Sequence, residues 1–246
     1  GGFSYIQQVQ SYGVPSDLVT VGTNGSPLLK EPLGIQQPPG TIAGFSRRLV
    51  LDDESFLLVS YFEHVSDASD TVVITHHDAA GMQLAPGTTL SGAYAGDLIL
   101  AKSTRGDVLA AYIDSDPATQ SGQALYIVPL SHDGVPMATP VAVPIVGAAD
   151  SPFDFALDPS PSGDMILTWV TYDQNPSAPT GFFAAEIDPA GSPRGPALRL
   201  GASAGNVSVV VSTDGAHALV VYTPLSGNAG GVALGVHTLP LECAMH

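Results

Sequence analysis

Charge is scarce in this chain of 246 residues, of which only 12% are charged and seven are Lys or Arg. Against 23 acidic residues this gives a formal net charge of −16. Such a charge makes binding to nucleic acid phosphates or to anionic lipid surfaces unfavourable. We therefore expect no nucleic acid partner, whereas cations, metal ions and neutral sugars stay open as ligands.

Cysteine, long apolar runs and helical periodicity are also missing or nearly so. The single cysteine, Cys243, excludes an internal disulfide framework and leaves the redox compartment open. No apolar run approaches the roughly 18 residues of a membrane-spanning helix, so we expect no membrane span. The first residues lack the basic and apolar regions of a signal peptide, although a leader removed before Gly1 stays an alternative. No stretch combines a sustained period of 3.6 with helix caps, which predicts a helix content near zero.

What the chain has in quantity is Gly, Pro and hydrophobic residues, with 27 Gly, 21 Pro and 44% hydrophobic side chains. This composition is typical of short strands joined by many turns. Residues 158–200 form a unit of turn, apolar run, polar loop, second run and closing strand. Three weaker copies surround it at a period of roughly 45–50 residues, which indicates a β-propeller with four-stranded blades.

We therefore predict an all-β propeller of about five four-stranded blades in one domain over residues 1–246, with the first blade incomplete. The predicted blades are residues 1–40, 41–93, 94–147, 148–202 and 203–246. The first blade lacks its innermost strand, and an open ring leaves unpaired edges. Either the tail at 239–246 completes it, or self-association or a partner chain supplies the missing strand.

Aligning the copies places an aromatic residue at the end of each second strand, namely Tyr61, Tyr112, Trp169 and Tyr222. An aromatic that recurs once per blade favours packing between blades over ligand binding. The tight turn after each third strand carries an Asp, and we interpret these carboxylates as turn caps.

The repeat resembles a known family of degenerate propeller repeats in secreted and cell-surface bacterial proteins. The pattern is G-x-[FML]-[IVL]-x-x-[WY] followed by D-x-x-G-x-P-x-G-P. The residues that carry it are Gly163, Met165, Ile166 and Trp169, then Asp188, Gly191, Pro193, Gly195 and Pro196. Such repeats occur in adhesins, binding modules and some hydrolase scaffolds, so the resemblance implies an extracellular setting more than a chemistry. The second and fifth copies depart from it, with Glu54-Ser55 in place of the turn Gly and Thr238-Leu239-Pro240 in place of the D-x-x-G turn.

The loops that join second to third strands should open on the same face as the loops between blades. Oxygen-rich side chains gather there, and such side chains can hold Ca²⁺. The predicted ligand-binding residues are Glu63, His64, Asp67, Asp70, Asp114, Asp116 and Asp173. The predicted metal ligands among them are Asp67, Asp70, Asp114 and Asp116. Solvated acidic loops without a ligand are the alternative, and no motif for an organic cofactor is present.

Two carboxylates could also face the central channel, because Asp97 and Asp154 open successive innermost strands. Five-bladed glycoside hydrolases need two carboxylates roughly 5–10 Å apart. Arg47 and Arg48 lie near the matching place of the second copy, and Asn206 lies there in the fifth. The G-x-S-x-G match at residues 201–205 precedes a strand instead of a helix, which argues against a nucleophilic Ser203.

The histidines are interpreted as structural. His76 and His77 are neighbours in a strand and point to opposite faces, so they cannot easily coordinate the same metal ion. His64, His132, His217 and His237 are scattered along the sequence and are interpreted as turn or packing residues.

The leading hypothesis is a secreted or cell-surface, non-enzymatic binding or assembly module that uses the acidic loop face. Its ligand would be a glycan or a protein. One alternative is a glycan-active hydrolase with Asp97 and Asp154 as catalytic carboxylates in the central funnel. Another is a structural subunit of an extracellular assembly. The expected location is extracellular or at the cell surface, with the periplasm as the alternative.

Overall fold

The computed structural model describes residues 3–7, 17–21, 23–33, 35, 38–64, 70–90, 98–115, 122–144, 151–172, 179–201, 207–211, 217–222 and 235–240. Within these ranges every regular element is a β-strand, and all strand pairings are antiparallel. None of the residues described forms a helix long and apolar enough to cross a membrane. The predicted all-β class is confirmed.

The chain divides into two compact units. The first consists of residues 1–95 together with 131–135, and the second of residues 96–130 together with 136–246. The short turn at 131–135 therefore belongs to the first unit, although the strands before and after it belong to the second.

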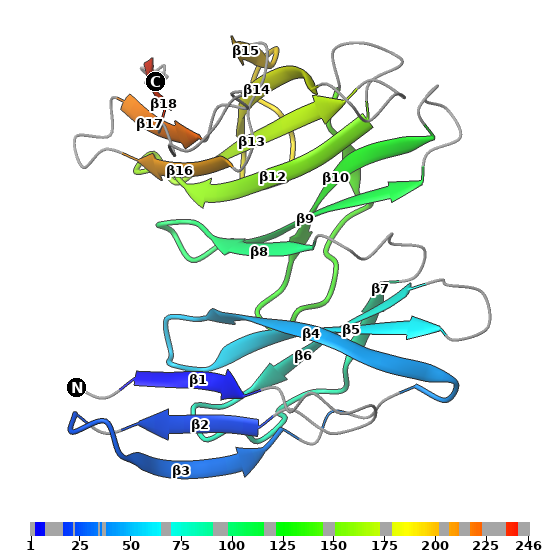
Figure 1. Ribbon diagram of the computed structural model, residues 1–246, viewed down its shortest axis with the longest axis vertical. Coiled ribbons are helices and arrows are strands. Elements are labelled where there is room, and N and C mark those ends of the chain that lie inside the picture. The colour runs from blue at the N-terminus through cyan, green and yellow to red at the C-terminus, as the bar shows by residue number, and fades with distance from the viewer. Residues whose placement is uncertain are drawn as a thin grey trace, which may run out of the picture. The chain divides into compact units, whose positions relative to one another are not determined.

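The described strands of the first unit form two sheets (Figure 1). The first sheet has the order β1 (Phe3–Gln7), β2 (Asp17–Val21) and β3 (Pro27–Pro32). The second has the order β4 (Thr41–Val50), β5 (Phe56–His64), β6 (Asp70–His77) and β7 (Thr88–Leu90). Each strand pairs with the next strand in the sequence, so both sheets are meanders.

The described strands of the second unit form three further meanders (Figure 1). The first consists of β8 (Ile99–Lys102), β9 (Val108–Ser115), β10 (Gln123–Leu130) and β11 (Val141–Ala142). The second consists of β12 (Ser151–Pro159), β13 (Met165–Tyr172), β14 (Pro179–Ile187) and β15 (Leu198–Gly201). The third consists of β16 (Val207–Val211), β17 (His217–Tyr222) and β18 (Gly235–Pro240).

The predicted repeat of four antiparallel strands is therefore present in three sheets of the described chain. The sheets at the two chain ends have three described strands each. One local prediction was wrong: residues 238–240 do not replace a turn, because they lie in β18 and pair with residues 217–219. The number of blades in a closed ring and the single-domain boundary stay predictions.

The turn between the first two strands has the same geometry in the second sheet as in the two that follow, despite the missing glycine. Gly106 and Gly163 occupy this turn with φ of 91° and 93°. Glu54 stands at the matching place and takes φ of 67°, a left-handed conformation that non-glycine residues rarely adopt. The hydrogen bond from the Glu54 N–H to the Leu51 carbonyl corresponds to that from Gly163 to Ser160. The departure from the repeat pattern therefore did not change the fold.

A second recurring glycine packs the turn after each third strand against the preceding sheet. A Cβ on Gly81 would lie 3.2 Å from Leu18 of β2, and one on Gly191 would lie 3.4 Å from Ile127 of β10. Gly134 is the tightest, because its Cβ would lie 2.6 Å from the Cγ2 atom of Ile74 in β6. All three positions favour glycine through their positive φ, and Gly134 needs it for close approach to Ile74 as well.

The aligned aromatic residues are buried wherever their side chains are described. Trp169 is fully buried and stacks on Phe183, with 5.7 Å between the ring centroids. Tyr61 and Tyr112 are also buried, whereas the Tyr222 side chain lies outside the described part of the chain. Trp169 belongs to a core formed by side chains of β8 to β10 and β12 to β14. This burial agrees with the interpretation of these residues as packing residues.

Candidate functional site

The acidic residues predicted to bind a ligand are only partly described. Glu63 is the second-last residue of β5, has an exposed side chain and lies opposite Asp70 in the pairing of β5 with β6. His64 lies opposite Thr41, and Asp114 is a half-buried residue of β9. Asp67, Asp116 and Asp173 lie outside the described residues. The structure thus brings Glu63 and Asp70 together, and the calcium site stays a prediction.

The Tyr112 hydroxyl lies near Asp114 at this edge of β9. Burial, together with the negative charge of Asp114 and the neighbouring Tyr126, raises the pKa of Tyr112 to about 12. The Tyr112 and Tyr126 rings stack with 5.7 Å between their centroids. Tyr112 is therefore a neutral hydrogen-bonding group at neutral pH and cannot serve as a base.

Asp154 lies in a β-bulge of β12. Pro152 pairs with Thr171 and Phe155 with Trp169, so two residues of β12, Phe153 and Asp154, stand against a single residue of β13. Bulges redirect side chains and are common beside active sites. Strand β12 contacts β8 and β16, the first strands of the neighbouring sheets (Figure 1). Asp154 therefore belongs to a strand that contacts the first strands of both neighbouring sheets, and its place in a central channel stays a prediction.

The strand register refines the predicted alignment around Asp154. Ile99 pairs with Ala111, so Leu98 comes opposite Tyr112 when the pairing is continued by one residue, just as Phe155 lies opposite Trp169. Asp97 precedes Leu98 in the sequence as Asp154 precedes Phe155, and Asn206 precedes Val207. Asp97 and Asn206 themselves lie outside the described residues.

The positions predicted for the two arginines near this place were wrong. In β4 the pairing of Ser46 with Ser60 makes Gly44 the counterpart of Asp154. Arg47 pairs further along with Val59 and is exposed. The Arg48 guanidinium lies 5.6 Å from the centroid of the Phe56 ring, as a cation–π contact. Neither arginine occupies the position of β4 that corresponds to Asp154 in β12.

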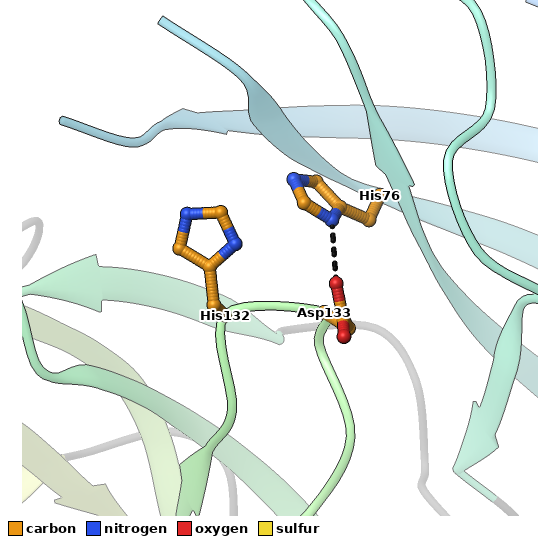
Figure 2. A group of neighbouring side chains, drawn as sticks. All are labelled: His76, His132 and Asp133. Carbon is orange, nitrogen blue, oxygen red and sulfur yellow. Dashed lines mark hydrogen bonds and ion pairs between the residues drawn. The ribbon is translucent and has the colours of Figure 1, made fainter. Parts of the chain in front are cut away.

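A second group of polar side chains meets at the turns of the first unit, and sequence reasoning missed it. His76 Nδ1 lies 2.9 Å from Asp133 Oδ1, and the His132 ring stands edge-on to His76 with 4.8 Å between the centroids (Figure 2). His76 is buried, while His132 and Asp133 are more than half exposed. His132 lies in a turn, as interpreted, but its contact with His76 was not predicted. The usable signal was the repeat alignment, which places His76 just before one turn and His132 within the corresponding turn of the next copy.

Asp53 and Ser55 extend this group on the other side of His76. His76 Nε2 lies 2.9 Å from Ser55 Oγ, and the Ser55 hydroxyl donates to Asp53 Oδ1 at 2.5 Å. The Asp53 carboxylate also lies 3.3 Å from His132 Nε2. The hydroxyl that donates to Asp53 is the main cause that lowers the pKa of this carboxyl. Asp53 is therefore ionised at neutral pH.

The sequence of contacts Ser55–His76–Asp133 matches the connectivity of a nucleophile, base and orienting acid. Two observations argue against that chemistry. Ser55 is only 4% exposed, and its hydroxyl hydrogen is directed to Asp53 instead of His76. A buried serine whose proton is already held by a carboxylate is not an accessible nucleophile.

His77, the neighbour of His76, binds different partners. Its Nδ1 lies 3.0 Å from the Gly81 carbonyl oxygen, and its Nε2 lies 2.8 Å from the Thr75 hydroxyl. Burial lowers the pKa of His77, so the ring stays neutral and packs against Phe56. The two histidines act separately, as neighbours in a strand must.

No protein-family model and no curated protein sequence matches this chain. Solved structures do share its fold. An α-L-arabinofuranosidase of Fusarium graminearum with arabinobiose is 13% identical, with a TM-score of 0.58 over 91% of this chain and 72% of that one. An endo-arabinase of Bacteroides thetaiotaomicron is 13% identical, with a TM-score of 0.51 over 98% of this chain and 94% of that one. An α-L-arabinanase of Penicillium chrysogenum with arabinobiose is also 13% identical, with a TM-score of 0.51 over 92% and 85%.

This likeness establishes the β-propeller fold and corrects the leading functional hypothesis. The chain was expected to be a non-enzymatic binding or assembly module. The solved structures that share its fold are an arabinofuranosidase and two arabinanases, which contradicts that expectation.

Proposed function

We propose that this protein is a glycan-active hydrolase whose catalytic carboxylates lie at the centre of a five-bladed propeller. The observation that carries the proposal is the fold it shares, over most of its length, with an arabinofuranosidase and two arabinanases. Function on a shared fold resides in particular side chains, so the proposal also needs a plausible pair of carboxylates.

Asp154 is the first of the two proposed carboxylates. Its place in a bulge of β12, next to the first strands of both neighbouring sheets, supports this role. First strands of propeller blades line the central channel, where a sugar can enter from one end. A bulge turns a side chain out of the regular alternation, which is how a strand residue can be directed toward a ligand.

Asp97 is the second proposed carboxylate, because it precedes Leu98 as Asp154 precedes Phe155. Leu98 and Phe155 are both buried, so the two strands are anchored alike immediately after their aspartates. Hydrolysis of a glycosidic bond needs one carboxylic acid that protonates the leaving oxygen. It also needs a second carboxylate that either activates water or attacks the sugar carbon. Asp154 in β12 and Asp97, two residues before β8 in the sequence, would supply this pair.

The composition of the chain fits a neutral sugar substrate outside the cell. A net charge of −16 repels polyanionic ligands but leaves the hydroxyl groups of a neutral glycan free to donate to carboxylates. We propose an extracellular or periplasmic location, in keeping with the secreted and cell-surface proteins whose repeats this chain resembles. Glycans that contain arabinofuranosyl units are the first substrates to test.

The proposal is tested by assaying the purified chain on arabinan, on arabino-oligosaccharides and on a panel of aryl glycosides. We expect hydrolysis of at least one substrate. Asp154→Asn and Asp97→Asn should each lower kcat by about 10²–10⁴, the usual contribution of an acid–base group.

The matched control is Glu54→Gln, which removes an exposed carboxylate in a turn of the first unit. It should leave kcat unchanged. Activity that survives both aspartate substitutions would eliminate this pair of residues. A folded protein that cleaves none of the glycans would overturn the function itself.

A further inference from the structure

The polar side chains at the turns of the first unit come from three separate segments. Asp53 lies in the turn between β4 and β5, and His76 is the second-last residue of β6. His132 and Asp133 lie in the turn at residues 131–135, which belongs to the same unit. One donor atom from each of His76, His132 and Asp133 lies within 4.8 Å of the other two.

Three contacts link His76, Ser55 and the two carboxylates, and a neutral His76 leaves one of these contacts without a hydrogen. They run from Asp53 to Ser55, from Ser55 to His76, and from His76 to Asp133. Each contact needs one hydrogen, or a cation, between two electronegative atoms. Ser55 supplies one hydrogen and a neutral imidazole supplies another, whereas ionised carboxylates supply none.

The position of the missing charge follows from the direction of the bonds. The Ser55 hydrogen is used by Asp53, so Ser55 Oγ must accept a hydrogen from His76 Nε2. The Nδ1 atom of a neutral His76 then carries a lone pair and faces the Asp133 oxygen at 2.9 Å. Two acceptors at this distance repel each other unless a cation lies between or beside them.

The second imidazole is held in the same way. His132 Nε2 lies 3.3 Å from Asp53 Oδ2 and can donate its hydrogen there. The Nδ1 atom of His132 then carries the lone pair. Figure 2 shows one nitrogen of this ring on the side of His76 and Asp133. Histidines that bind a metal ion almost always donate their other N–H to a carboxylate, a backbone carbonyl or water, and a hydroxyl oxygen accepts this hydrogen in the same way. Asp53 and Ser55 provide that support to both rings.

We propose that His76, His132 and Asp133 bind one divalent transition-metal ion, zinc, through His76 Nδ1, His132 Nδ1 and an Asp133 oxygen. Two imidazoles and a carboxylate are ligands that zinc favours, and water from the exposed side completes a tetrahedron. Ligand atoms around tetrahedral zinc lie about 3.3 Å apart. His132 and Asp133 stand on an exposed turn and can close the remaining distance by small side-chain rotations.

The ion would fasten the turn at residues 131–135 to the sheet β4 to β7. That turn is also held by the close packing of Gly134 on Ile74. The site is independent of the proposed hydrolase function, because neither Asp97 nor Asp154 belongs to it.

The test is zinc binding by the full chain, stripped with a chelator and then titrated calorimetrically. We expect one zinc ion per chain and a rise in melting temperature that the chelator reverses. His132→Ala and Asp133→Asn should each weaken zinc binding at least about 100-fold. Both residues are exposed, so these variants should fold, as circular dichroism would verify.

Two further variants separate binding from general stability. Asp53→Asn removes only the supporting carboxylate, so it should weaken binding about 10–100-fold and keep one ion per chain. Glu186→Gln, at the place in the sheet β12 to β15 that matches His76, should bind zinc as the parent does. Cobalt in place of zinc should give the visible absorption of a four-coordinate site, and His132→Ala should abolish it.

A folded parent protein that binds no zinc would overturn the proposal. Zinc binding that is unchanged in His132→Ala and Asp133→Asn would overturn it as well, because the ion would lie elsewhere.

Discussion

The sheets β4 to β7 and β12 to β15 contain the same pair of turns, but the polar side chains at equivalent positions of these turns differ. In each sheet the fifth residue of the first turn faces a residue near the end of the third strand. These two positions are Ser55 and His76 in one sheet, and Asp164 and Glu186 in the other. The backbone bonds that define the match run from Leu84 to His76 and from Arg194 to Glu186.

The difference lies in where the positive charge comes from. Arg194 binds Asp164 through two hydrogen bonds of 2.6 and 2.9 Å, so the acidic pair of the later sheet carries its own cation. Leu84 stands at the matching place of the earlier sheet, which gives His76 and Asp133 no such partner. The same pair of turns thus contains an arginine as its cation in the later sheet and, as proposed above, binds a zinc ion in the earlier one.

The strongest way to break the comparison is to push a turn away from the preceding sheet. Gly134→Ala should cost about 2–4 kcal/mol, because it forces alanine into a left-handed conformation and places its Cβ 2.6 Å from Ile74. Gly191→Ala should cost only about 1–2 kcal/mol, since its nearest contacts are 3.4 Å away. Urea unfolding of both variants measures the difference. Equal losses would show that the packing distance does not matter.

Removal of the carboxylate beside the built-in cation should have a smaller effect. Asp164→Asn should cost about 1–2 kcal/mol, because Asp164 is 8% exposed and its bonds to Arg194 are charge-assisted. Asp107→Asn is the control, at the matching position of the sheet β8 to β11, where the carboxylate accepts from the Ser103 hydroxyl. Thermal unfolding should show the larger loss for Asp164→Asn, and the reverse order would contradict the role of Arg194.

The smallest expected effect concerns pH. Burial and the neighbouring Asp164 raise the pKa of Glu186. The Glu186 carboxyl group therefore binds its proton more tightly in the folded protein than in the unfolded chain. The favourable contribution of protonated Glu186 to the free energy of unfolding is therefore complete below about pH 4.3. It is lost as the pH rises through the pKa that Glu186 has in the folded protein. Because the Glu186 side chain is only partly buried, solvent screens the effect, and Glu186→Gln should stabilise the protein by roughly 0.5 kcal/mol or less at neutral pH. This gain should vanish near about pH 4. A gain that instead grows as pH falls would mean that the sign is wrong.

The sequence predicted the strands and turns better than it predicted the groups of side chains. Tyr61, Tyr112 and Trp169 lie in the second strands of their sheets, as predicted, because an apolar run between two turn signals leaves little choice. Glu54 adopts the glycine conformation that the pattern did not allow for, since the hydrogen bonds of the turn compel it. The meeting of His76 with His132 depends on how one turn packs on another sheet, and no local pattern encodes that. The bulge at Asp154 was likewise invisible, because alternation along a strand cannot show where two residues oppose one.

The recurring glycine contacts all run in one direction along the chain. Gly81, Gly134 and Gly191 each pack onto a sheet whose strands precede them in the sequence. During synthesis, each new hairpin would therefore meet a docking surface that has already left the ribosome, and need not wait for residues still to come. Such an order of assembly lets the protein fold progressively from its N-terminal side, and it limits how long apolar strand edges stay open to other chains.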